Sequence, residues 1–142
     1  MNLNEALEEI EKAIEEIKEK NKNVPILVEG EKDVMALQNL GISGKIITIH
    51  CGKEIANLCD YIASHYKEII ILTDWDRRGW RLCREIERNL EGRTKCITEY
   101  RLIFAKNSMV KDIEGMPSFL KNLKRKVKER RQRRLRNYKK SF

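Results

Sequence analysis

The sequence has few aromatic residues (6%), only two histidines and two prolines, and no apolar run long enough to cross a membrane. A membrane-spanning helix needs about 20 consecutive apolar residues, and the acidic N-terminal residues are unlike those of a secretory signal peptide. We therefore expect a cytoplasmic protein with no membrane partner. Because 41% of the 142 residues are hydrophobic, the chain should still fold around one core.

Cysteine pairs of the kind that bind zinc are also absent. The four cysteines are Cys51, Cys59, Cys83 and Cys96, and none of them forms a Cys-x-x-Cys pair. This spacing argues against a zinc site, and a reducing compartment disfavours disulfides. We expect most of these residues to be buried thiols, and no signature supports a Cys/His nucleophile.

Positive charge is concentrated at the C-terminal end of the chain. The net charge is +8, but residues 121–142 hold 12 Lys or Arg and one Glu, while the rest holds 18 basic and 21 acidic residues. Such density is typical of a segment that neutralises nucleic-acid phosphates, and a ribosomal or other ribonucleoprotein surface fits equally well. The residues expected to bind nucleic acid are Lys124, Arg125, Lys126, Lys128, Arg130, Arg131, Arg133, Arg134 and Arg136.

Buried strands and amphipathic helices alternate along the chain. Short apolar runs predict strands at 26–28, 46–49, 69–72 and 95–98, and helices are expected at 34–40, 53–66 and 77–90. This alternation predicts a parallel sheet with right-handed crossovers. An N-terminal helix capped by Asn4 should present an apolar stripe formed by Leu3, Leu7, Ile10, Ile14 and Ile17. A last helix should begin near Pro117 and end in the basic segment.

We divide the chain accordingly into three parts. Residues 1–23 form the N-terminal helix that packs on the core, residues 24–120 form the α/β domain, and residues 121–142 form the basic tail. The α/β domain is where we expect any metal or catalytic site.

The stretch 69–79, which reads IIILTDWDRRG, organises the rest of the chain. Its four apolar residues predict a strand buried on both faces, and Asp74 and Asp76 follow where that strand should end. Ligands of open α/β sheets bind outside the carboxyl ends of the strands, and carboxylates there suit a hard cation such as Mg²⁺. The simpler interpretation makes Asp76 the N-cap of the next helix.

A second acidic turn follows the first strand, where Glu29 precedes Gly30. Carboxylates from this turn and from Asp74 and Asp76 can share a cation only if the first and third strands are neighbours. A sheet order of 2-1-3-4 makes them neighbours and places the site where the winding reverses. Such a site suits phosphoryl-transfer or phosphodiester chemistry.

The segments 26–33 (ILVEGEKD) and 70–79 (IILTDWDRRG) resemble the two signature motifs of the Toprim family. That family includes type IA and type II topoisomerases, bacterial primases, recombination mediators and the ribonuclease that matures 5S ribosomal RNA. The resemblance covers about residues 24–98. It implies a single Toprim-like, Rossmann-like α/β domain with a four-stranded, mostly parallel sheet of order 2-1-3-4 and helices on both faces.

The resemblance also implies roles for individual residues. Glu29 matches the family's glutamate, which helps to bind metal and acts as catalytic general acid or base. Asp74 and Asp76 match the pair that holds Mg²⁺, with Mn²⁺ as substitute, and Gly79 matches the glycine that follows. The candidate accessory residues are Lys32, Arg77, Lys111 and Asp112; Lys111 and Asp112 resemble a Lys-Asp element of primase-like members.

Several alternatives stay open from the sequence. Trp75 either stacks on a base or lies buried under a helix. Arg77, Arg78 and Arg81 either contact backbone phosphates or are solvated at the surface. Glu31 and Asp33 fit helix-entry acids better than ligands. The leading functional expectation is a Mg²⁺-dependent nuclease or phosphotransferase acting on structured RNA or DNA. The alternatives are a non-catalytic module that binds nucleic acid or protein, and a subunit that needs a partner chain.

Overall fold

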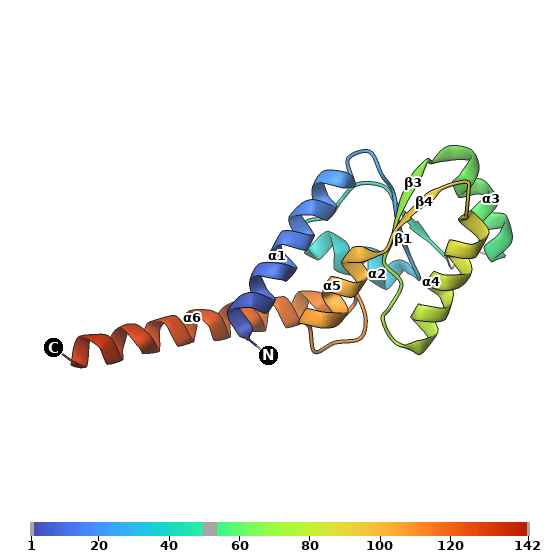
Figure 1. Ribbon diagram of the computed structural model, residues 1–142. Helices are drawn as coiled ribbons and strands as arrows, with labels where there is room; N and C mark the ends of the chain where they lie inside the picture. The colour runs from blue at the N-terminus through green and yellow to red at the C-terminus, as the bar shows by residue number, and fades with distance from the viewer. Residues whose placement is uncertain (1, 50–53, 142) are drawn as a thin grey trace.

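The computed structural model describes residues 2–49 and 54–141 and contains a four-stranded parallel sheet (Figure 1). The strands are β1 (Ile26–Val28), β2 (Ile46–Thr48), β3 (Glu68–Ile71) and β4 (Lys95–Ile97). Their order is β2-β1-β3-β4, which confirms the predicted sheet. Cys51 and Lys53, the residue at which the second helix was expected to begin, lie outside the described ranges.

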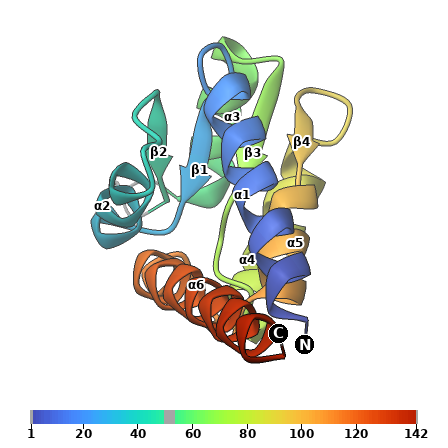
Figure 2. The same ribbon diagram turned by 90° about the vertical axis from the view of Figure 1, so that its left-hand side faces the viewer.

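Helices cover both faces of this sheet, as Figure 2 shows from a second side. One face carries α1 (Leu3–Lys20), α2 (Glu31–Asn39), α5 (Glu99–Asn107) and α6 (Met116–Lys140). The other face carries α3 (Ile55–His65) and α4 (Arg77–Leu90). The part of the chain that is described contains no helix long and apolar enough to cross a membrane.

Each buried strand contributes alternate side chains to two separate cores. Ile26 and Val28 of β1 face the core beneath α1 and α5, whereas Leu27 between them faces the core beneath α3 and α4. In β3, Ile70 and Ile71 divide in the same way. A strand covered on both faces has no polar side, which explains the continuous apolar runs in the sequence.

Helix ends follow local signals that the sequence only partly revealed. The N-cap of α1 is Asn2 and not Asn4, because Asn2 Oδ1 accepts the backbone N–H groups of Asn4 and Glu5 at 3.0 and 3.2 Å. At the end of α2, Gly41 adopts a positive φ of 87°, a conformation that glycine favours. The observed bounds of α4 match the predicted range 77–90.

Two helical features differ from the sequence-based expectation. Helix α5 was not predicted, although it packs directly against α1. Helix α6 does not end in the basic segment but continues through it to Lys140. Its first turns pack on the body through four residues: Met116, Leu120, Leu123 and Val127. Beyond Val127 the described side chains are all exposed, and the helix extends away from the body (Figure 1).

Candidate functional site

Two acidic residues meet where strands β1 and β3 end side by side. These strands pair in parallel, with Leu27 opposite Ile71, so the turns that follow them lie at one edge of the sheet. Glu29 follows β1 and is only 6% exposed. Its Oε2 accepts the backbone N–H of Asp74, which follows β3, at 2.8 Å. The expectation that these two turns are neighbours is therefore confirmed.

The carboxyl group of Asp74 is poorly compensated by its surroundings. Its Oδ1 is buried and has no hydrogen-bond partner among the described residues. Burial, followed by the negative charges of Glu29 and Asp33, raises the pKa of Asp74 to about 7, and the backbone N–H of Ile113 opposes this increase. A carboxylate in this position is costly unless a positive charge joins it.

Asp33 adds a second buried acid to the same edge. It is 8% exposed, and its Oδ2 accepts the N–H of Gly30 at 3.1 Å, which closes the turn after Glu29. Burial raises the pKa of Asp33, with further contributions from Glu29, Glu114 and Asp112. Asp33 thus caps α2, as the helix-entry interpretation predicts, but it is buried and not exposed to solvent, and its negative charge contributes to the raised pKa of Asp74.

Asp76 lies apart from this pair. It is exposed and forms the N-cap of α4, where its Oδ1 accepts the N–H of Gly79 at 2.8 Å. Across residues 2–49 and 54–141, no group of three His, Cys, Asp or Glu side chains is placed to hold a metal ion. The structure therefore brings Glu29 and Asp74 together without Asp76, and the shared metal site stays a prediction.

Gly79 allows the first turn of α4 to contact the strand end. A Cβ atom at this position would overlap the carbonyl group of Asp74. Thr73 Oγ1 donates to the Gly79 carbonyl oxygen at 2.8 Å and fixes the same contact from the other side. Only glycine permits this approach, so the sequence signal at Gly79 reflects backbone packing around Asp74.

Trp75 has a structural role. Its backbone N–H donates to the Lys111 carbonyl at 2.9 Å, and its indole Nε1–H donates to the Val110 carbonyl at 2.6 Å. Its ring centroid lies 6.0 Å from that of Phe104. These contacts favour burial over base stacking, and they hold the segment that contains Lys111 and Asp112 against the acidic edge.

The candidate accessory residues differ in what they contact. Asp112 Oδ1 accepts the Gly115 N–H at 2.8 Å, just before α6 begins, and its charge raises the pKa of Asp74. Lys32, Arg77 and Lys111 are exposed. A ligand that approaches from solvent can therefore reach them.

Arg101 is a site-supporting residue that sequence reasoning missed. It is 4% exposed and lies in the unpredicted helix α5. Its Nε donates to the Thr73 carbonyl at 2.9 Å, and its Nη2 donates to the Asp74 carbonyl at 2.6 Å. The guanidinium group thereby fixes the backbone that carries Asp74. The only sequence signal for this role was a basic residue among apolar and aromatic neighbours at 100–104.

The basic residues of α6 form two groups. In the packed half, Lys124 lies 3.9 Å from Glu11 of α1, and Arg125 pairs with Glu129 at 3.1 Å. The remaining residues predicted to bind nucleic acid lie on exposed helix surface: Lys126, Lys128, Arg130, Arg131, Arg133, Arg134 and Arg136. The helical backbone presents this charge in a fixed arrangement.

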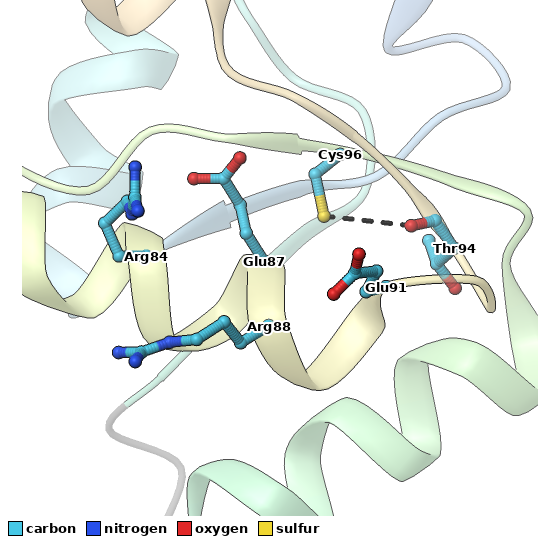
Figure 3. A pocket seen from close by; sticks show the side chains of 6 residues that line it. All are labelled: Arg84, Glu87, Arg88, Glu91, Thr94 and Cys96. Atoms are coloured by element: carbon cyan, nitrogen blue, oxygen red, sulfur yellow. Dashed lines mark hydrogen bonds between the residues drawn. The ribbon is translucent and has the colours of Figure 1, made fainter.

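A pocket beside β4 is chemically different from the acidic edge (Figure 3). It encloses about 380 Å³ and is lined by Arg84, Glu87, Arg88, Glu91, Thr94 and Cys96. Burial, with the nearby charge of Glu87, raises the pKa of Cys96 to about 12, and Cys96 Sγ donates to the Thr94 carbonyl at 3.8 Å. This thiol is protonated at neutral pH and is not an activated nucleophile. Cys59 and Cys83 are buried, as expected.

Comparison with known proteins agrees with this geometry. The model of the Toprim domain matches residues 24–107. A UPF0292 protein of Methanocaldococcus jannaschii is 33% identical over 125 residues, which cover 84% of this chain and 96% of that protein. A UPF0292 protein of Methanosarcina barkeri is 33% identical over 128 residues, which cover 85% of this chain and 87% of that protein. A solved structure from Aquifex aeolicus superimposes with a TM-score of 0.64 at 27% identity, covering 73% of this chain and 94% of that one.

Proposed function

This chain belongs to the Toprim family, and on that premise we propose that it performs Mg²⁺-dependent phosphodiester chemistry as a nuclease acting on structured RNA or DNA. Toprim domains are associated with divalent metal ions and with nucleic acid. The observation that carries the proposal is the buried Oδ1 of Asp74, which lies beside the carboxylate of Glu29 and has no hydrogen-bond partner among the described residues.

These two residues fit a divalent cation. Hard cations take oxygen ligands, and adjacent carboxylates repel each other until a cation joins them. Glu29 and Asp74 would hold Mg²⁺, or Mn²⁺ in its place, and the bound cation would polarise a phosphate oxygen. Asp76 Oδ1 accepts the N–H of Gly79, so Asp76 would add a third carboxylate through its other oxygen or by releasing this N–H.

The chain's own groups supply the remaining functions. Glu29 Oε2 accepts the Asp74 N–H, so Oε1 is the oxygen that would contact the cation or take a proton from an attacking water. Arg101 holds the Asp74 backbone in place. Lys32 and Arg77, exposed near the acidic edge, are suited to orient substrate phosphates.

The projecting half of α6 supplies affinity in this proposal. Its basic side chains are exposed and can neutralise phosphates, which is the main source of sequence-independent binding. The partner is nucleic acid, either free or within a ribosomal or other ribonucleoprotein particle.

One observation favours a second candidate, a non-catalytic binding module. The carboxylate of Asp76, which the motif resemblance assigns to the metal, caps α4 instead. A chain that holds a cation too weakly for chemistry could still use the same edge and the basic helix to bind nucleic acid or a protein partner.

A cleavage assay separates the two candidates. Wild type is incubated with labelled hairpin RNA, duplex DNA and single-stranded forms of each, in Mg²⁺ or EDTA. The nuclease proposal expects Mg²⁺-dependent cleavage that Glu29→Gln abolishes while nucleic-acid affinity stays nearly intact. The matched control is Glu31→Gln, an exposed acid of the same turn. No cleavage of any substrate, or equal cleavage by Glu29→Gln and wild type, would contradict the nuclease proposal.

A further inference from the structure

The first two turns of α4 carry an exposed aromatic ring among arginines. Trp80 is 52% exposed, and the guanidinium carbon of Arg84 lies 5.3 Å from the centroid of its ring. Arg77, Arg78 and Arg81 are exposed on the same turns. Residues 77–84 contain four arginines and no acidic side chain, although the exposed Asp76 directly precedes them.

This surface adjoins the acidic edge. Trp80 follows Gly79, whose backbone packs against Asp74, and the Trp80 N–H donates to the Asp76 carbonyl at 3.0 Å. The ring therefore projects from the same helical turn that contacts the strand end. A nucleotide next to a phosphate held by the cation proposed at Glu29 and Asp74 would lie beside this turn.

We propose that Trp80 is a stacking platform for an unpaired base, and that the surrounding arginines hold the phosphates of that single-stranded segment. This inference rests on the proposed action on nucleic acid. An aromatic ring beside basic side chains is the usual arrangement for binding single strands, because every base offers a π-face. Arg84 strengthens the platform by a cation–π contact with the ring.

The base must be unpaired for a geometric reason. A base inside a duplex is already stacked on both sides, so it has no free face for an exposed ring. The proposed substrate class is therefore structured nucleic acid with a single-stranded segment at the reacting position. Farther along α4 the charge is mixed, with Glu85 and Glu87 followed by Arg88.

Trp80 does not resemble the centre of a protein interface. Such a centre is a contiguous apolar patch. In the described ranges, the other large hydrophobic residues with high exposure lie outside α4: Met35, Leu102, Met109, Leu135 and Tyr138. Trp80 has Arg77 and Arg84 on its own face of the helix and no other large exposed hydrophobic residue on α4, so it suits an anionic, aromatic ligand better than an apolar one.

The test measures binding in EDTA, where no cleavage occurs, by fluorescence anisotropy of a labelled single-stranded oligonucleotide. Trp80→Ala should weaken binding about tenfold, because it removes one base stack. Trp80→Phe should retain most of the affinity. The same oligonucleotide with abasic sites should bind wild type and Trp80→Ala alike. Leu102→Ala, an exposed residue of α5, is the control and should bind as wild type.

Several outcomes would overturn the inference. Unchanged affinity of Trp80→Ala, or an equal loss with abasic and blunt duplex ligands, would exclude base stacking. Loss of self-association in Trp80→Ala, measured by light scattering, would instead assign the ring to a contact between copies of the chain. Base-dependent binding without any Mg²⁺-dependent cleavage would refute the nuclease proposal and leave this inference standing, whereas no binding to any nucleic acid would refute both.

Discussion

Replacing Asp74 by asparagine should stabilise the metal-free protein. In the wild type, the Asp74 carboxyl group is surrounded by Glu29 and Asp33, and its Oδ1 is buried without a partner among the described residues. Asparagine keeps the shape, removes the negative charge and adds an N–H donor that can face Glu29. A metal ligand that costs stability when no cation is bound is the expected mark of a cation site.

The magnitude follows from the pKa of Asp74, which is raised from 3.8 to about 7. That increase corresponds to about 4 kcal/mol if it acts in full. Asp74 is only partly buried, so solvent screening reduces the effect, and we expect a gain of about 1–2 kcal/mol at pH 7.5. For a chain of this size such a gain raises the melting temperature by about 3–8 °C.

The pH dependence has a defined sign. Between pH 4 and pH 7 the folded protein retains the Asp74 proton that the unfolded chain has lost, so the free energy of unfolding decreases as the pH rises through this window. Above about pH 7 the penalty is complete and constant. The Asp74→Asn variant lacks this decrease, and the two proteins should converge in stability near pH 4.

The measurement is urea unfolding followed by circular dichroism at several pH values in EDTA. Asp76→Asn is the matched control, because Asp76 is exposed and asparagine is an equally good N-cap. It should resemble wild type at every pH. An Asp74→Asn protein less stable than wild type at pH 7.5 would refute the electrostatic reasoning.

Three further changes test the framework around the site. Gly79→Ala should lower the free energy of unfolding by about 3 kcal/mol, because the alanine Cβ would overlap the Asp74 carbonyl. A melting temperature close to that of the wild type would contradict this overlap. Arg101→Lys should lower the free energy of unfolding by about 2 kcal/mol, because lysine cannot donate to the carbonyls of Thr73 and Asp74 at once. An unchanged midpoint in urea unfolding would contradict the supporting role of Arg101. Truncation after Lys128 keeps the buried Val127 and removes the projecting part of α6. The slope of log affinity for nucleic acid against log salt concentration should become shallower by about 0.9 for each duplex phosphate that the helix no longer neutralises. An unchanged slope would assign the helix another role.

Much of the fold was predictable because its signals are local. The apolar run 69–72 can be buried only in a central strand, and the predicted range 77–90 of α4 was correct because an acid precedes the helix and a glycine follows it. Topology then supplied the long-range result: parallel strands end at one edge, so Glu29 and Asp74 had to meet once β1 and β3 were neighbours.

The remaining features depend on packing that the sequence does not encode locally. Helix α5 has no clear cap, and its register is set by packing against α1. The two tryptophans illustrate the same limit. Trp75, adjacent to the acids in sequence, is fixed against Val110 and Phe104, whereas Trp80 is left exposed. Which ring faces solvent depends on the course of a segment 35 residues away.

Glu29 and Asp74, from two neighbouring strands, are proposed to hold one divalent cation, and titration calorimetry with Mn²⁺ tests this most directly. The proteins to compare are wild type, Glu29→Gln, Asp74→Asn and the control Glu31→Gln. We expect one weak site in wild type and in Glu31→Gln, because such sites usually rely on substrate phosphate as well. In Glu29→Gln and Asp74→Asn the affinity should fall at least about tenfold. Equal Mn²⁺ binding by all four proteins would contradict the shared site.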